Sequence, residues 1–285
     1  MTLSKNLLIG FHVSIKDSLS SAFDGAIELN CTTFQIFTRN PRAWRFKPLQ
    51  EAEVGSFLKR RRQTDFKYVV AHMPYLPNLA SPMKALMKKS RSSLKEEVNR
   101  CDSLRIDYLV AHIGSHMGKG TMVGVRNVAE ACNEALDASD GKTTLLIENM
   151  AGQKNCVGAR FEELKLILDL VEKRRRVGIC FDTCHSFAAG FDLTSKAAVE
   201  ETMSLFDELV GLKEIKTVHL NDSKGALGSA LDRHEHIGIG GIGKEGFRAF
   251  LHYEGIRELP ILMETPVDVR RSDAENMATV RRLAS

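Results

Sequence analysis

The stretch that decides the fold is 177-VGICFDTCHSFAAGFD-192. Its first residues, VGICF, form a short apolar run, which predicts a buried strand. The strand leads directly into Asp182, and a buried Asp is almost always paired or bound to a metal. Asp182 alone could also be a helix N-cap, because its side chain would then accept backbone N–H groups. The choice depends on how the other strands end.

Eight short β-rich runs alternate with helical patterns such as 18-SLSSAFDGAIEL-29 and 161-FEELKLILDLV-171. The runs are LLIGFHV (7–13), FQIF (34–37), YVVAH (68–72), YLVAH (108–112), TLLIE (144–148), VGICFD (177–182), TVHL (217–220) and ILMET (261–265). This alternation predicts an α/β fold, a single (β/α)8 TIM barrel over residues 1–285. A doubly wound sheet is the alternative, but a Gly-rich turn is expected after its first strand, and HVSIKDSL has no glycine.

The composition is that of an ordinary globular protein, with 43% hydrophobic and 27% charged residues. The net charge of +4 is compatible with a polyanionic partner but does not establish one. The six cysteines form no CxxC pair, so we expect a reduced, cytoplasmic protein. The sequence shows no signal-peptide pattern and no apolar run near the roughly 20 residues that span a bilayer, so no membrane association is expected.

Seven of the eight predicted strands end in a residue that can bind metal or move protons. The terminal residues are His12, Phe37, His72, His112, Glu148, Asp182, His219 and Glu264. In a barrel all these ends meet at the C-terminal face, where active sites lie. Crowded carboxylates repel each other unless cations compensate them, and mixed imidazole and carboxylate ligands favour Zn²⁺, with Mn²⁺ or Fe possible.

Two further segments lie in predicted loops. In 231-LDRHEHIGIGGIG-243, Asp232 and His234 have a spacing that could clamp one ion, although a plain polar loop is the alternative. In 38-TRNPRAWRFK-47, basic residues surround Trp44, a pattern that suits a DNA backbone, or else a solvated loop anchored by the indole. The basic runs 59–62 and 173–176 fall near predicted helix C-termini, opposite the active face.

These residues resemble the endonuclease IV family of apurinic/apyrimidinic endonucleases over nearly the whole chain. The resemblance is carried by 146-LIENMAGQ-153, 180-CFDTCHSFAAGFD-192, 219-HLNDSK-224, 232-DRHEHIGIGGIG-243 and 263-METP-266. It implies a (β/α)8 barrel with three metal ions, usually zinc. One departure is Ile113, where many members are expected to have proline.

The resemblance implies three ligand sets. They are His72, His112 and Glu148; Glu148, Asp182, His219 and Glu264; and His185, Asp232 and His234. It further implies catalytic roles for Glu148, Asp182 and Glu264, and a hydroxide that bridges two ions as the nucleophile. The reaction would be hydrolysis 5′ to an abasic site in double-stranded DNA, giving a 3′-hydroxyl and a 5′-deoxyribose phosphate.

The resemblance also places Arg42, Tyr75 and Leu76 at DNA-inserting positions, and we expect a monomer. The main competing hypothesis is a metal-dependent sugar isomerase or epimerase of the same barrel superfamily. Such an enzyme uses one or two metals, for which the four ligands Glu148, Asp182, His219 and Glu264 suffice. The additional residues His72, His112, His185, Asp232 and His234 favour the nuclease.

Overall fold

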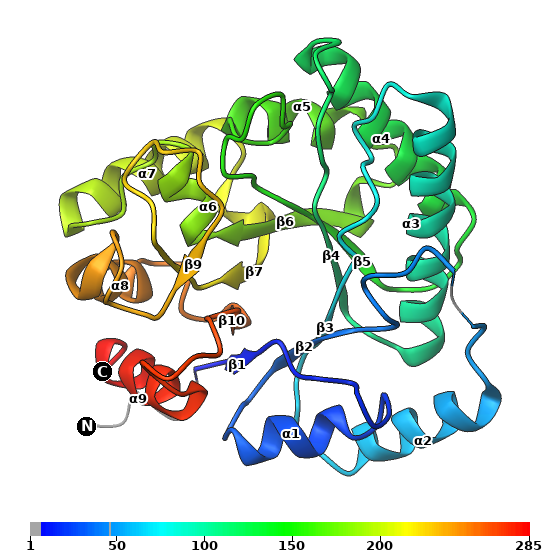
Figure 1. Cartoon of the computed structure of the whole chain (residues 1–285), viewed down its shortest axis with the longest axis horizontal. Helices are drawn as coiled ribbons and strands as arrows, with labels where there is room; N and C mark the ends of the chain where they lie inside the picture. Colours follow the sequence, from blue (N-terminus) through cyan, green and yellow to red (C-terminus); the bar gives the residue numbers. More distant parts are fainter. Residues whose placement is uncertain (1–6, 46) are drawn as a thin grey trace.

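The computed structural model describes residues 7–45 and 47–285 and contains one eight-stranded parallel sheet surrounded by helices (Figure 1). The strands are β1 (Ile9–Phe11), β2 (Phe34–Phe37), β3 (Val69–His72), β4 (Tyr108–Ala111), β5 (Thr144–Glu148), β6 (Val177–Asp182), β7 (Ile215–His219) and β10 (Ile261–Met263). Their order is β1-β10-β7-β6-β5-β4-β3-β2, and a parallel bridge between His12 and Gln35 joins the two ends. The predicted barrel is confirmed.

The helices form the outer layer. They are α1 (Ala22–Glu28), α2 (Glu51–Arg62), α3 (Lys84–Leu104), α4 (Thr121–Asp137), α5 (Phe161–Leu170), α6 (Thr183–Ala188), α7 (Lys196–Leu209), α8 (Gly243–His252) and α9 (Asp273–Leu283), with short 3-10 turns η1 (Arg174–Arg176) and η2 (Leu212–Glu214). Two of them, α6 and α7, lie between β6 and β7, so this connection is longer than a single helix. In the described part of the chain no helix is long and apolar enough to cross a membrane.

The barrel interior determines where the polar strand ends point. A small cluster of buried side chains fills it, made of Val70, Val110, Leu146, Cys180 and Leu262. Side chains on a strand alternate between its two faces, so the residue two positions later faces the same side. Those later residues are His72, His112, Glu148, Asp182 and Glu264. The pleat of the strands therefore directs the predicted ligands toward the barrel axis at its C-terminal end.

Two details differ from the sequence-based expectations. His12, His112 and Glu264 lie one residue beyond the ends of β1, β4 and β10. A small antiparallel hairpin, β8 (Asp222–Ser223) with β9 (His234–Glu235), forms where only a loop was predicted. The buried carboxylate of Asp222 accepts N–H bonds from Gly238, Gly240 and Ile242, each at 2.9 Å, and so ties the glycine-rich segment to the hairpin. Such a contact between distant residues leaves no periodic signal.

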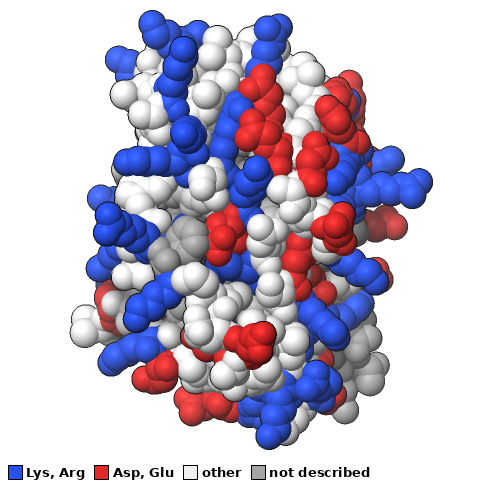
Figure 2. Space-filling model, turned by 90° about the vertical axis from the view of Figure 1, so that its right-hand side faces the viewer, with Lys and Arg blue, Asp and Glu red and all other residues white. Residues whose placement is uncertain are grey.

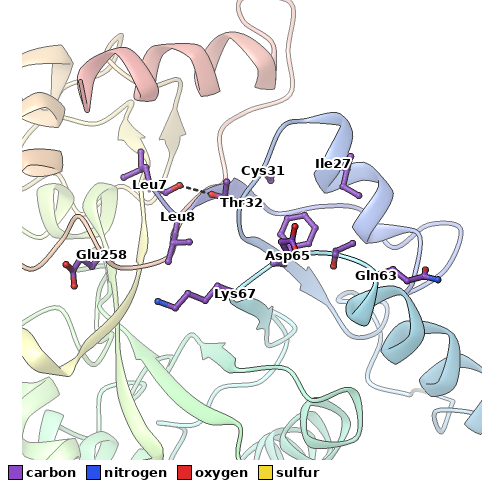
Figure 3. A pocket seen from close by; sticks show the side chains of 11 residues that line it. Leu7, Leu8, Ile27, Cys31, Thr32, Gln63, Asp65, Lys67 and Glu258 are labelled. Carbon is purple, nitrogen blue, oxygen red and sulfur yellow. Dashed lines mark hydrogen bonds between the residues drawn. The ribbon is translucent and has the colours of Figure 1, made fainter. Parts of the chain in front are cut away.

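A hollow of about 820 Å³ is lined by residues on the N-terminal side of β1 and β3, including Leu8 and Lys67 (Figure 3). Thr32 Oγ1 donates a hydrogen bond to the carbonyl oxygen of Leu7 at its edge. Burial raises the pKa of the Cys31 thiol in its wall to about 12, so this group stays protonated and is a poor nucleophile. The hollow is on the wrong side of the strands to share the chemistry of the C-terminal face.

Candidate active site

Glu148, at the end of β5, lies at the centre of the site and is fully buried. Its Oε2 atom is 3.3 Å from His72 Nε2 and 3.0 Å from His112 Nε2. Its Oε1 atom is 3.0 Å from His219 Nδ1. Burial alone would raise the pKa of Glu148, but the imidazoles of His112 and His219 outweigh it and hold that pKa well below its usual range. The carboxylate is therefore ionised and available to more than one cation.

A second group joins Glu148 to side chains from three other strand ends. The ligand atoms of Glu148, Asp182, His219 and Glu264 all lie within 4.8 Å of one another. His219 Nδ1 is 3.4 Å from Glu264 Oε2 and 3.9 Å from Asp182 Oδ2. Three carboxylates around one imidazole form an acidic centre of the kind that a divalent cation compensates.

A third group lies on the β6 and β9 side. Asp232 Oδ1 is 3.1 Å from His185 Nε2 and 3.6 Å from His234 Nε2. Burial raises the pKa of Asp232, yet the imidazoles around it, His185 above all, outweigh burial and lower that pKa to about 2. A neighbouring thiol, Cys184, could form a group with Asp182 and His234. Burial raises the pKa of Cys184 to about 12 and its Sγ faces the carbonyl oxygen of Arg233, so it is a poor ligand.

The tautomers of three histidines test whether cations fit this site. The Nδ1 atom faces a backbone carbonyl oxygen in His72 (Met73, 2.7 Å), His185 (Asn149, 2.9 Å) and His234 (Glu264, 3.1 Å). A ring that donates through Nδ1 has its lone pair on Nε2, as in metal-bound histidines. In His185 and His234 this buried Nε2 atom has no hydrogen-bond partner. Unpartnered nitrogen lone pairs beside ionised carboxylates are the donor set that zinc prefers.

The structure thus brings all nine predicted ligand residues together at one end of the barrel. His12, the remaining polar strand end, lies at the edge of this group with its Nδ1 atom 3.5 Å from Glu264 Oε1. Desolvation lowers the pKa of His12 despite the hydrogen bond and charge of Glu264, so the ring is mostly neutral at pH 7.

Three amide side chains support the ligands and were not predicted from the sequence. Gln35 Nε2 donates to Glu264 Oε1 at 2.8 Å, and Gln35 Oε1 accepts from His219 Nε2 at 2.9 Å. Asn221 Nδ2 donates to Asp182 Oδ2, and Asn221 Oδ1 accepts the backbone N–H of Glu264, both at 2.8 Å. Asn149 bonds the backbone of Asp182. The sequence signal that could have revealed them is an amide side chain within or just after an apolar run, such as Gln35 in FQIF.

The predicted DNA-inserting residues lie on the loops that follow β2 and β3, at the C-terminal end of the barrel. Tyr75 is 58% exposed, although its ring centroid is only 5.8 Å from that of His72. Leu76 is 38% exposed and Arg42 is also exposed on the loop after β2. Partial desolvation and the nearby carboxylates of Glu264 and Glu148 raise the pKa of Tyr75 to about 12, so its hydroxyl stays protonated. The side chain can therefore act as a wedge or a hydrogen-bonding group.

The basic runs 59–62 and 173–176 lie elsewhere, and several of their arginines are in ion pairs. Arg61 pairs with Asp107 at 2.8 Å, and Arg174 with Glu214 at the same distance. Run 59–62 ends α2 before β3, and run 173–176 leads into the first residue of β6, so both lie toward the N-terminal ends of the strands, opposite the active end, as predicted.

The chain is similar to known proteins over nearly its whole length. A family model described as "Xylose isomerase-like TIM barrel" matches residues 23–283. A probable endonuclease 4 from Methanoculleus marisnigri is 48% identical over 98% of this chain and 99% of its own length. A second, from Nitrosopumilus maritimus, is 44% identical over 97% and 99%.

Solved structures agree. The crystal structure of endonuclease IV from Thermus thermophilus superposes with a TM-score of 0.86 at 35% identity, covering 96% of this chain and 98% of that one. A D-tagatose 3-epimerase-like protein superposes with a TM-score of 0.72 at 20% identity, which shows a shared fold alone. The near full-length identity to the endonucleases decides between the two groups, and the chain belongs to the endonuclease IV family.

Proposed function

We propose that this protein hydrolyses the phosphodiester bond 5′ to an abasic site in double-stranded DNA, leaving a 3′-hydroxyl and a 5′-deoxyribose phosphate. The observation that carries the proposal is the ligand group of His185, Asp232 and His234, which lies beside the ligand groups that share Glu148. A sugar isomerase or epimerase needs one or two metals and has no use for that group. The relatives named probable endonuclease 4 support the same conclusion.

Three divalent cations would occupy the site, zinc above all, with Mn²⁺ or Fe possible at one position. One would be held by Glu148 with His72 and His112, which both contact its Oε2 atom. The others would be held by Glu148, Asp182, His219 and Glu264, and by His185, Asp232 and His234. When bound, divalent cations neutralise the charge of the phosphate and make water a stronger nucleophile at neutral pH.

The chain itself supplies orientation. Gln35 donates to the carboxylate of Glu264, and Asn221 accepts the backbone N–H of the same residue, so both its side chain and its backbone are held beside the cluster. Rigid support of this kind lets a site stabilise developing charge without reorganising during the reaction. We assign the catalytic roles to Glu148, Asp182 and Glu264. Their three carboxylates form the acidic centre around His219.

Substrate access requires the DNA to deform. Glu148 and Asp182 are fully buried, so a phosphate within an intact stacked duplex cannot reach them, and the abasic nucleotide must be turned out. Tyr75, Leu76 and Arg42 are exposed around the site and would fill the resulting gap in the base stack.

The test uses a 5′-labelled duplex with one tetrahydrofuran abasic analogue, which a β-elimination lyase cannot cut. We expect the metal-loaded protein to cleave it on the 5′ side and to leave an end that a DNA polymerase extends. Failure to cut this duplex, together with epimerisation of a ketohexose, would establish the sugar-enzyme alternative instead.

A further inference from the structure

A groove of about 640 Å³ lies between the loop after β2 and the outer surface of α3. Its walls and floor are formed by Trp44, Arg45, Ala85, Lys88, Lys89, Ser92 and Ser93. Three of these, Arg45, Lys88 and Lys89, are exposed cations, and none of the described residues that line the groove is acidic. Figure 2 faces the side of the molecule where α3 lies in Figure 1 and shows Lys and Arg gathered in its upper left part. The groove is therefore strongly cationic.

The loop wall of this groove is held rigidly by buried charges. Arg39 pairs with the fully buried Glu97 of α3 and donates from Nη1 to the carbonyl oxygen of Ala43 at 2.7 Å. Arg100, one turn further along α3, donates from Nη1 to the carbonyl oxygen of Lys47 at 3.1 Å. Charges buried at this depth are tolerated only when hydrogen bonds satisfy them, so the backbone is fixed at Ala43 and at Lys47. The groove is thus preformed.

Trp44 gives the groove a flat apolar surface next to its cations. The indole is half-buried, and Lys89 Nζ lies 5.9 Å from the ring centroid, within cation–π range. An aromatic face between basic side chains suits a sugar-phosphate backbone, in which anionic oxygens alternate with apolar deoxyribose. The same loop carries Arg42, so an occupant of the groove would be continuous with DNA at the active end.

We propose that this groove binds the phosphate backbone of the duplex that flanks the abasic nucleotide, outside the catalytic opening. The inference rests on the proposed function, because it takes duplex DNA as the substrate. The positive charge of the groove is complementary to a polyanion, and this identifies DNA as its ligand. The consequence is an affinity for undamaged duplex that does not depend on the lesion or on the metal-ligand cluster.

The test compares two double variants that each remove two positive charges. Lys88→Ala/Lys89→Ala empties one wall of the groove, and Lys59→Ala/Arg62→Ala removes exposed charges from the far end of α2 as a matched control. Each phosphate contact contributes about 0.9 to the slope of log K against log salt, so the groove variant should lower that slope by about 2. Its affinity for undamaged duplex should fall on the order of tenfold, while the control keeps the wild-type slope.

Trp44 provides a second readout because it is the only tryptophan in the chain. Saturating undamaged duplex should shift its emission in the wild type and in the control variant. An unchanged slope in Lys88→Ala/Lys89→Ala, equal changes in both double variants, or no Trp44 response would overturn the groove assignment. Stronger competition by polyglutamate than by duplex of equal charge would also overturn it, in favour of an acidic protein partner. Binding to undamaged duplex is measured without cleavage, so the two proposals fail on different results. A wild type that binds this duplex but does not cut abasic duplex contradicts the proposed function and not the groove assignment.

Discussion

Asn149 and Asp182 hydrogen-bond to each other in both directions across the ends of two neighbouring strands. Asn149 Nδ2 donates to the carbonyl oxygen of Asp182 at 3.1 Å, and the N–H of Asp182 donates to Asn149 Oδ1 at 2.7 Å. The amide extends the pairing of β5 and β6 by one step beyond Glu148, which lies opposite Cys180 in the register. Two carboxylates that would repel each other are thereby held on adjacent strands.

Asn149→Ala should destabilise the protein, because it leaves the buried N–H of Asp182 without a partner. The expected loss in the free energy of unfolding is about 1–3 kcal/mol, measured by urea denaturation of metal-loaded protein. Asn99→Ala, on the exposed side of α3, is the control and should stay within about 0.5 kcal/mol of the wild type. Equal stability of the two variants would show that the Asn149 amide does not hold the strand ends.

Removing the carboxylate of the third ligand group should remove one cation selectively. Among the described residues, Asp232 groups with His185 and His234 and belongs to none of the ligand groups that contain Glu148. Asp232→Ala should therefore lower the metal content from about three divalent ions per chain to about two, as measured by elemental analysis. A wild-type content near one in active protein would contradict the three-site assignment and favour the isomerase alternative.

Glu264→Gln should abolish most of the activity without changing the fold. The substitution keeps the shape of the side chain but removes a charge that lies 3.4 Å from His219 Nδ1. Cleavage of an abasic duplex should fall by about 10²- to 10³-fold, the loss typical of removing one electrostatic stabiliser. Circular dichroism should be unchanged. Near-normal turnover in this variant would exclude Glu264 from the mechanism.

The strand ends could be predicted because two local rules combine there. Alternation along each strand places Leu146 and Glu148 on one face, and parallel pairing brings all such ends to the same side. The supporting amides are different, because the role of Gln35 depends on His219 and Glu264, which are far away in the chain. No local period encodes that contact.

The β8–β9 hairpin was missed for a related reason. Each strand has only two residues, too few for an alternating pattern to be visible. Asp222 stabilises the segment through backbone N–H groups, which every sequence offers equally. The spacing of Asp232 and His234 predicts that they bind one ion, but it does not predict the hairpin that presents His234.

Arg42→Ala should weaken duplex binding while leaving the metal content unchanged. Arg42 is exposed on the loop after β2, and its N–H bonds to Asn40 Oδ1 at 3.0 Å, so the backbone turn does not depend on the guanidinium. Affinity for abasic duplex, measured by fluorescence anisotropy, should fall by roughly tenfold, the effect of losing one desolvated contact to DNA. Unchanged affinity would remove Arg42 from the interface.

Tyr75→Ala should impair cleavage of abasic sites in duplex DNA more than in a flexible single strand. The Tyr75 ring is exposed above His72 and His112, with centroid separations of 5.8 and 6.1 Å, so it can enter the base stack without disturbing the ligands. Opening a stacked step costs a few kcal/mol, which an inserted aromatic ring offsets, whereas a single strand has no such step to open. We expect duplex cleavage at low substrate concentration to fall by roughly 10- to 100-fold, with single-strand cleavage and elemental metal content nearly unchanged.

Tyr75→Phe is the matched control and should retain wild-type behaviour, because the phenol stays protonated and the aromatic ring is the part that enters the base stack. If both substrates lose activity equally, or Tyr75→Phe is as impaired as Tyr75→Ala, the ring is not a wedge even though the nuclease assignment can stand.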